Sequence, residues 1–274
     1  MIDTHSHLLP GVDHGSPDLD TSLRMVRDAV AAGTTEVVCT PHLYEYDVGL
    51  LQRAREAVTT FRAALASEGL DLAIRLGFEA TLEVVTAAGL EDDSGPLQSL
   101  VVEGTSADGS GGVLIIEVPF HGWPVYFEDT VFRLSTRGFI PVLAHPERND
   151  RVQVDPGVLS PCLEAGAVLQ GTAGSLSALF RRDSARAFHE LLARGWYSLL
   201  ASDAHADTEY TYSLAPLLAE LVSRVPVPTL DALVHENPRQ LLAGERPRPP
   251  RMAGQSSGDR SGRPRARLPW WKRR

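Results

Sequence analysis

Met1-Ile-Asp-Thr-His5-Ser-His7 is a short apolar run that ends in two histidines two residues apart. On a β-strand, residues i and i+2 point to the same face, so both imidazoles can reach one point in space. A lone histidine is more often a hydrogen-bonded or surface residue than a ligand, which makes the pair by itself a weak signal. Its meaning depends on whether later strands bring further ligands to the same point.

The composition is that of a soluble globular protein of 274 residues, with 43% hydrophobic and 22% charged residues. This length suffices for one α/β barrel or for two small domains. The sequence has no apolar run near 18 residues and no basic-then-apolar leader, so we expect a cytoplasmic protein. The two cysteines, Cys39 and Cys162, are too few for a disulfide framework or a thiolate zinc site. Neither is followed by an arginine six residues later, so the Cys-x5-Arg phosphatase loop is absent.

Strand-like and helix-like segments alternate over most of the chain. Strands are predicted at Met1–Asp3, Glu36–Cys39, Leu72–Leu76, Val113–Glu117, Phe139–Ala144, Ala167–Gln170 and Tyr197–Ala201. Helices are predicted at 16–33, 50–68, 125–136, 156–165, 174–194, 213–223 and 229–243, and residues 91–112 are predicted to be weakly structured. Such alternation implies parallel strands with right-handed crossovers, and we therefore predict an α/β fold of the barrel type.

Polar side chains capable of binding a metal follow these predicted strands. They are His5, His7, His42, Glu79, Glu117, His145, Asp203 and His205, with His14 in the first loop. In a (β/α) barrel all these positions lie on the C-terminal face, where such barrels carry their chemistry. An isolated acid such as Asp203 after a strand is often only a helix cap, but the joint pattern indicates one site. Imidazoles and carboxylates in this mixture suit Zn, Mn or Fe(II), and carboxylates can bridge two ions.

Three other histidines lack this placement. His189 and His235 fall on predicted helices and are interpreted as structural or surface residues. His121, four residues after Glu117, is interpreted as a loop residue, with a substrate contact as the alternative.

The last 31 residues differ in charge from the rest of the chain. Residues 244–274 contain five prolines and ten Arg or Lys against two acids, a net charge of +8, whereas residues 1–243 carry −17. We expect this tail to be disordered. It is either a solvated basic tail or, through Trp270, Trp271 and its cations, an anchor on the inner membrane surface. The acidic body argues against nucleic-acid binding.

The motifs together resemble the PHP (polymerase and histidinol phosphatase) superfamily. Within it, the chain is most similar to the bacterial manganese-dependent protein-tyrosine phosphatases of capsule and exopolysaccharide clusters, of the CpsB/YwqE type. The resemblance extends from residue 1 to about residue 243 and includes the late Glu236-Asn237-Pro238-Arg239. It is carried by Ile2-Asp-Thr-His5-Ser-His7-Leu-Leu-Pro-Gly-Val-Asp13-His14-Gly15, Thr40-Pro-His42, Gly77-Phe-Glu79, Ile116-Glu117, Ala144-His145-Pro-Glu-Arg148 and Ala201-Ser-Asp203-Ala-His205.

This resemblance implies one domain over residues 1–243, a distorted (β/α)7 TIM-like barrel that holds two to three divalent ions. Manganese is the expected metal, with iron or zinc as alternatives. The implied metal ligands are His5, His7, His14, His42, Glu79, Glu117, His145, Asp203 and His205. Arg148 maps to the arginine that binds phosphate, and we predict that Arg148, Asp203 and His205 carry the reaction.

The sequence departs from the family pattern at two places. Where the family usually has Asp-Asp-Gly, this chain has Asp13-His14-Gly15, so that either His14 or Asp13 takes the place of the expected aspartate ligand. In addition, members often carry an arginine shortly after the Asp-x-His pair, and here the segment from Ala206 to Tyr212 has none.

The predicted activity is hydrolysis of phosphotyrosine on a protein, with a capsule-type bacterial tyrosine kinase as the expected partner. Divalent ions lower the pKa of bound water so that hydroxide can attack phosphorus in line. One alternative is a PHP phosphoesterase for a small ester such as histidinol phosphate, or for a nucleotide. Another is a non-catalytic regulator of polysaccharide export with structural metals. The sequence leaves the oligomeric state open.

Overall fold

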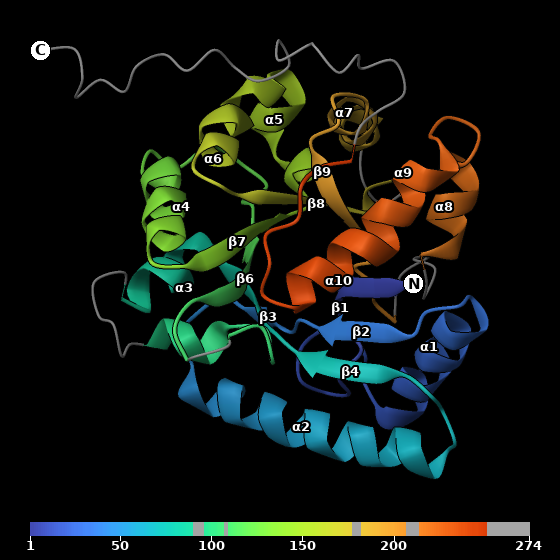
Figure 1. The fold of residues 1–274 in the computed structure, drawn as a ribbon. Coiled ribbons are helices and arrows are strands. Elements are labelled where there is room, and N and C mark those ends of the chain that lie inside the picture. Colours follow the sequence, from blue (N-terminus) through green and yellow to red (C-terminus); the bar gives the residue numbers. More distant parts are fainter. Residues whose placement is uncertain (90–95, 107–108, 177–181, 207–213, 251–274) are drawn as a thin grey trace, which may run out of the picture.

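The computed structural model describes residues 1–89, 96–106, 109–176, 182–206 and 214–250. Parallel strands occupy the middle of the molecule and helices surround them (Figure 1). The strands are β1 (Ile2–Ser6), β2 (Glu36–Cys39), β3 (His42–Leu43), β4 (Ala73–Leu76), β5 (Glu79–Thr81), β6 (Gly112–Glu117), β7 (Phe139–Ala144), β8 (Val168–Thr172) and β9 (Tyr197–Ala201).

The strands form two parallel sheets, with the orders β1-β2-β4 and β3-β5-β6-β7-β8-β9. The chain bends after β2 into β3 and after β4 into β5, so two neighbouring paths pass from the first sheet into the second. The Gly77 amide donates to the Cys39 carbonyl (2.9 Å) and the Glu79 amide to the Pro41 carbonyl (3.2 Å), which continues the pairing across both bends. The sequence pattern did not predict these bends.

The last strand returns to the first. The His7 amide donates to the Ala204 carbonyl (3.0 Å) and the Asp203 amide to the His5 carbonyl (2.9 Å), just beyond the ends of β1 and β9. If β2 with β3, and β4 with β5, are each counted as one bent strand, the strands follow one another in a distorted, interrupted ring. The predicted α/β fold with parallel strands is confirmed.

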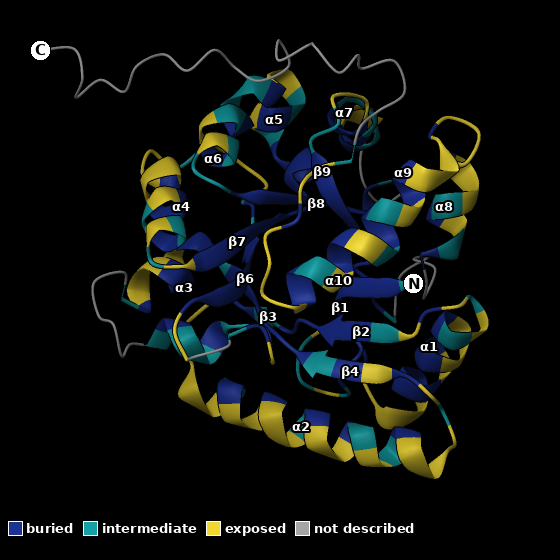
Figure 2. Cartoon of the chain, in the orientation of Figure 1, coloured by how far each residue is buried: buried dark blue, intermediate teal, exposed yellow. Residues whose placement is uncertain are grey.

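Alternate residues of the strands enter two different cores. In β6, Val113 and Ile115 face a cluster that lies among the strands, whereas Leu114 and Ile116 pack in the larger cluster with the helices. A strand buried on both faces has an almost continuous apolar sequence, as β6 does. Figure 2 shows the strands largely buried, with an exposed residue at the start of β4, and the outer faces of the helices exposed.

Helices cover the outside of the strands (Figure 1). The longer ones have one buried stripe each; α2, for example, buries five apolar or small residues at helical spacing. The α-helices are α1 (Leu19–Ala31), α2 (Val48–Ser67), α3 (Leu82–Ala87), α4 (Phe127–Thr136), α5 (Asp150–Val154), α6 (Ser160–Glu164), α7 (Arg182–Ala193), α8 (Ala215–Leu221), α9 (Val227–Asp231) and α10 (Asn237–Leu242). Short turns of 3-10 helix lie at Pro96–Leu100, Pro146–Arg148, Pro156–Leu159 and Ala173–Leu176.

Two predicted helices differ in detail. Asp18, not Ser16, caps α1, because its side chain accepts from the Thr21 amide (2.8 Å), while Ser16 is buried and accepts from Ser22 Oγ (2.7 Å). The helix predicted at 229–243 consists of α9, a π-helical turn at Ala232–Glu236 and α10.

Among the described residues, no helix has the length and apolar character needed to cross a membrane. The chain beyond α10 stays on the body as far as it is described, since Arg246 donates to the Phe139 carbonyl (3.2 Å) and Asn237 to the Arg248 carbonyl (2.9 Å). The rest of the predicted tail, residues 251–274, lies outside the described residues, as do parts of the segments predicted at 91–112, 174–194 and 213–223.

Candidate metal centre

Two strained residues mark the centre. Among the described non-glycine residues, only His145 and Asp203 have a positive φ, of 35° and 54°. Left-handed backbone costs a residue with a Cβ about 1–3 kcal/mol and is typical of functional sites. His145 directly follows β7, and Asp203 lies two residues beyond β9. Both strained residues therefore lie at the C-terminal ends of strands.

Four donors form a small cage there. His5 Nε2 lies 3.2 Å from Glu79 Oε2 and 3.5 Å from Asp203 Oδ1, and His7 Nε2 lies 3.4 Å and 3.2 Å from the same two oxygens. The two Nε2 atoms are 3.2 Å apart. Four donors that each lie about 2.1 Å from an ion at the centre of a tetrahedron are separated by about 3.4 Å. All four residues are buried, and the cage therefore has the size and the ligands of a site for a divalent cation.

The outer nitrogens of both histidines are held by fixed partners. His5 Nδ1 is hydrogen-bonded to Gln170 Oε1 (2.8 Å), and the Gln170 amide donates to Thr4 Oγ1 (2.8 Å). His7 Nδ1 is hydrogen-bonded to Asp13 Oδ2 (2.7 Å). When Nδ1 donates to an oxygen, Nε2 carries the lone pair that a metal needs, so these contacts orient both rings as ligands.

Glu79 also joins the cage to a second group of donors. Its Oε2 lies 2.9 Å from His42 Nδ1 and its Oε1 lies 2.6 Å from His145 Nε2. Ligand atoms of His42, Glu79 and Glu117 lie within 4.8 Å of one another, and so do those of His7, His42 and His205. One buried carboxylate thus contacts donors on several sides, which is the arrangement of a carboxylate that bridges ions.

The electrostatics of the centre favour a bound cation. Burial and the charges of Glu79 and Asp203 raise the pKa of Glu117 to about 8, because several carboxylates share a small volume. Burial and the neighbouring His7 lower the pKa of His205 to about 4, which keeps its imidazole neutral as a ligand must be. In addition, His145 Nδ1 is buried without a hydrogen bond, although Nε2 of the same ring contacts Glu79. A divalent ion would relieve the carboxylate repulsion and provide a partner for such an atom.

Asp13 and His14 occupy different places. The carboxylate of Asp13 accepts from His7 Nδ1 (2.7 Å), the His42 amide (3.1 Å) and the Gly15 amide (2.9 Å), so it is bound behind the ligands. The ring of His14 stacks on His42 with centroids 4.6 Å apart. Its centroid lies 5.0 Å from that of His205.

Arg148 lies beside the cage. Its Nη2 is 2.6 Å from Asp203 Oδ2, while Oδ1 of the same carboxylate faces the two cage histidines. Arg148 Nε donates to Ser175 Oγ (3.0 Å) and Nη2 donates to Thr172 Oγ1 (2.9 Å). A buried guanidinium is therefore fixed one carboxylate away from the cage histidines.

Glu147 supports this arginine from behind, a role that sequence reasoning missed. It is fully buried and accepts from Ser175 Oγ (2.6 Å), the Thr172 amide (3.1 Å) and Tyr197 Oη (2.7 Å). Burial and the adjacent Glu147 charge raise the pKa of Tyr197 well above its ordinary value, which keeps it a donor. Glu147 thus orients the Ser175 hydroxyl directly and Thr172 through its backbone amide, and both residues hold Arg148.

We expect Glu147→Gln to lower the free energy of unfolding by about 1–3 kcal/mol, because an amide nitrogen cannot accept the buried Tyr197 hydroxyl hydrogen bond. Urea unfolding of the two proteins, followed by circular dichroism, measures this difference. Glu164→Gln, an exposed glutamate in α6, is the control and should change stability by less than about 0.5 kcal/mol. Equal unfolding midpoints for Glu147→Gln and the native chain would contradict the expected role of Glu147.

Three histidines lie apart from the centre. His121 is 90% exposed in its side chain and contacts Asp150. His189 is 3.7 Å from Glu220, and His235 is hydrogen-bonded to Asp231 on its own helical stretch. The segment 207–213, in which the sequence lacks the expected arginine, lies outside the described residues.

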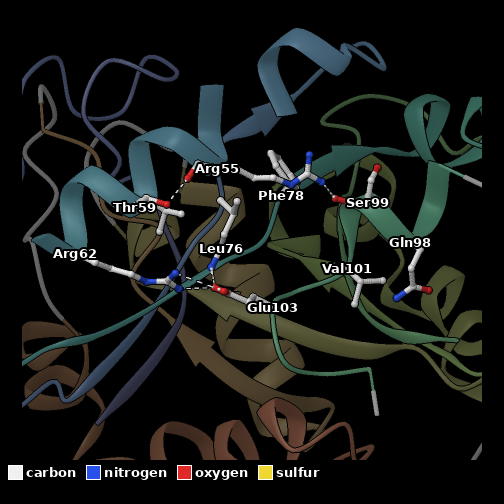
Figure 3. Close-up of a pocket in the computed structure, with 10 residues that line it drawn as sticks. Arg55, Thr59, Arg62, Leu76, Phe78, Gln98, Ser99, Val101 and Glu103 are labelled. Atoms are coloured by element: carbon white, nitrogen blue, oxygen red, sulfur yellow. Dashed lines mark hydrogen bonds and ion pairs between the residues drawn. The ribbon is translucent and has the colours of Figure 1, made fainter. Parts of the chain in front are cut away.

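A separate pocket of about 290 Å³ lies between α2 and residues 98–103 (Figure 3). None of the candidate metal ligands lines it. Its Arg62 is ion-paired with Glu103 and also donates to the Ile74 carbonyl (2.6 Å), so its charge is neutralised within the protein. The pocket therefore plays no part in the centre.

Fold and site together define a class: α/β proteins with parallel strands whose histidines and carboxylates form a metal-binding centre at the C-terminal strand ends. Residues 1–243 match the family described as capsular polysaccharide synthesis, CpsB/CapC. The chain belongs to this family.

Known relatives and solved structures are similar to this chain. The tyrosine-protein phosphatase YwqE of Bacillus subtilis (strain 168) is 32% identical over 209 residues, which cover 75% of this chain and 77% of the relative. A solved structure described as YwqE from Bacillus subtilis and CpsB from Streptococcus pneumoniae, metal-dependent tyrosine phosphatases, has 28% identity and a TM-score of 0.71, and the match covers 92% of this chain and 100% of that one. An organophosphorus hydrolase from Deinococcus radiodurans (15% identity, TM-score 0.55, 88% and 92% covered) shares the fold alone.

Cation uptake should release protons. Burial lowers the pKa of His7, but its contacts with Asp13, Asp203 and Glu79 outweigh this and raise the pKa well above its ordinary value. A histidine that is protonated in the metal-free protein must lose its proton to bind a cation, so affinity should weaken as the pH falls below that raised pKa. We expect about one to two protons released per ion. Titration calorimetry with Mn²⁺ in two buffers of different ionisation enthalpy measures the release, and identical heats in both buffers would contradict it.

Proposed function

We propose that the protein is a metal-dependent phosphatase that hydrolyses phosphotyrosine in proteins. The observation that carries this function is the cage of His5, His7, Glu79 and Asp203 directly beside the buried guanidinium of Arg148. A cation site and a fixed arginine on one carboxylate are the two elements that bind a phosphoryl group.

The residues suited to hold two or three divalent ions either belong to the cage or lie beside it. When bound, such ions supply positive charge for the phosphoryl oxygens and lower the pKa of water toward neutrality. Manganese is the proposed metal, with iron and zinc as alternatives, because the donors are mixed imidazoles and carboxylates. The proposed ligands are His5, His7, His14, His42, Glu79, Glu117, His145, Asp203 and His205.

His14 is included because of what Asp13 does. The three hydrogen bonds of Asp13 occupy both its oxygens behind His7 and His42. The ring of His14 is next to His42 and His205 on the side of the donors. A neutral imidazole in place of an anion lowers the negative charge around the ions and favours borderline metals such as zinc more than a carboxylate would.

Arg148 and Asp203 have complementary tasks in the proposed reaction. Arg148 would supply positive charge to the phosphoryl oxygens from a guanidinium that Ser175 and Thr172 hold in place. Asp203 keeps Arg148 at the centre through one oxygen while the other oxygen faces the cage. His205, whose lowered pKa leaves its imidazole neutral, is suited to hold a cation beside the reacting group. The departing phenolate has an ordinary pKa of about 10, so it needs less protonation than an alkoxide.

Phosphate release from a phosphotyrosine peptide tests the proposal. The protein is stripped with a chelator, reloaded with Mn²⁺, Zn²⁺ or Fe²⁺, and assayed with the peptide and with histidinol phosphate. Turnover of the peptide that depends on the added metal supports the proposal. Turnover of histidinol phosphate without turnover of the peptide would replace it by a small-ester phosphatase, and no turnover of either would favour a non-catalytic regulator.

We also propose that residues 1–243 form the catalytic domain, and that residues 244–274 form a basic tail that brings it to an anionic membrane surface and to a membrane-bound tyrosine kinase. Support comes from the family match, which covers residues 1–243, and from the ten cations and two tryptophans of the tail. Co-sedimentation with vesicles that contain phosphatidylserine compares the full chain with a chain that ends at residue 250. Equal binding by both proteins would reject membrane contact through the tail.

A further inference from the structure

Two exposed aromatic side chains flank the metal centre. Tyr44 is 57% exposed and Phe120 is 43% exposed, although large apolar side chains usually avoid water. Tyr44 stacks on His42 with ring centroids 5.1 Å apart and an angle of 15° between the planes. Phe120 lies 6.0 Å from the ring of His145. Tyr44 thus lies against His42 and Phe120 lies near His145, and these two histidines contact the two different oxygens of Glu79.

The backbone holds both rings at this rim. In β3, His42 and Leu43 alternate, with Leu43 buried in the core, so residue 44 returns to the side of His42. Phe120 belongs to the loop after β6, and its carbonyl accepts from the Asp150 amide (3.0 Å). Asn149, which directly follows Arg148, is fully buried. Its side-chain amide donates to the carbonyls of Pro119 (2.6 Å) and Gly122 (2.7 Å). An exposed ring on a loop fixed in this way is positioned for contact with something outside the chain.

We propose that Tyr44 and Phe120 form the recognition site for the phenyl ring of the substrate, and so select phosphotyrosine over phosphoserine and phosphothreonine. With the phosphoryl group at the cage and Arg148, the ring of a phosphotyrosine extends outward past His42 and His145. Aromatic rings pack in offset or edge-to-face pairs with centroids 4.5–7 Å apart. A serine or threonine phosphate has no ring and gains nothing from such a rim.

This selectivity presupposes the proposed phosphotyrosine activity, and the test separates the two. Tyr44→Ala, Phe120→Ala and the double variant are assayed in the metal-loaded full chain with a phosphotyrosine peptide, and the inhibition constant for inorganic phosphate is measured in each. We expect each single change to raise KM for the peptide about five- to tenfold with kcat within about twofold, and the double variant to combine both effects. The inhibition constant for phosphate, which has no ring, should stay within about twofold of the native value.

Ring-preserving and distant variants are the controls. Tyr44→Phe and Phe120→Tyr should retain native KM, whereas Phe120→Leu, which keeps bulk without a ring, should behave like the alanine variant. Phe132→Ala removes an exposed phenylalanine of α4 and should leave KM unchanged. Native KM in both alanine variants would overturn the recognition site while leaving the phosphatase function intact. A matching rise in the phosphate inhibition constant would also overturn it, because the rings would then support the centre itself. Absence of peptide turnover by the native protein would instead overturn the proposed function.

Discussion

Glu79→Gln is expected to abolish phosphotyrosine hydrolysis, with a loss in kcat of about 10³-fold or more, and to lower the number of bound ions. Glu79 is buried, and its oxygens contact His5, His7, His42 and His145. Burial alone would raise its pKa, but the surrounding histidines hold the pKa well below its usual range, so Glu79 is an anion among them. The glutamine side chain has the same shape but no negative charge, so every cation that Glu79 would bind loses an anionic ligand.

Metal content by inductively coupled plasma mass spectrometry and the rise in melting temperature on addition of Mn²⁺ measure this loss independently of turnover. Both should decrease in Glu79→Gln and remain native in Glu56→Gln, an exposed glutamate of α2. Native metal content in the Glu79→Gln protein would contradict the assignment of Glu79 as a ligand.

Arg148→Lys should lower kcat/KM for a phosphotyrosine peptide by about 10²- to 10³-fold without loss of metal. Lysine keeps the positive charge beside Asp203 but is a single point donor, so it cannot reproduce the contacts of Nε with Ser175 and of Nη2 with Thr172. The fixed orientation of the charge beside the cage would be lost with the planar guanidinium.

Steady-state kinetics and metal content together test this result, with Arg194→Lys as the control. Arg194 is 43% exposed in its side chain and pairs with Glu190 on the surface, so its replacement should leave kcat/KM unchanged. A kcat/KM within about threefold of native for Arg148→Lys would show that charge alone is sufficient at this position.

The sequence predicted the fold class because buried parallel strands leave strong local signals. β6, β7 and β9 are short apolar runs followed by polar ligands, and their predicted bounds agree with the structure to within one residue. The bends into β3 and β5 left no such signal, since each new strand has only two or three residues and is held by backbone hydrogen bonds to a distant segment. In the broken helix at 227–242 the apolar residues recur at helical spacing from end to end, so the sequence pattern does not reveal the π-helical turn.

The juxtaposition of the candidate ligands was predictable where a donor residue follows a predicted strand, and less so where a residue acts through another. His5, His7, Glu79 and Asp203 come together as their positions after strands indicated. Gln170 and Glu147 were not singled out, although a glutamine within a buried strand and a glutamate two residues from His145 were available hints. Whether Asp13 is a ligand or a support depends on which nitrogen of His7 it meets, and only the three-dimensional structure contains that information.

The contact between β1 and the segment after β9 also bears on how the protein matures. His5 and His7 come early in the chain and Asp203 comes late, yet one cation would be shared among them. During synthesis the ribosome must extend the chain past Asp203 before the cage has all four of its donors, so the complete cage cannot form in a shorter chain. Once the ends have met, an ion at 1,000 times its Kd would stabilise the folded protein by about 4 kcal/mol. Because its ligands come from both ends of the ring, that stabilisation resists the separation of β1 from β9.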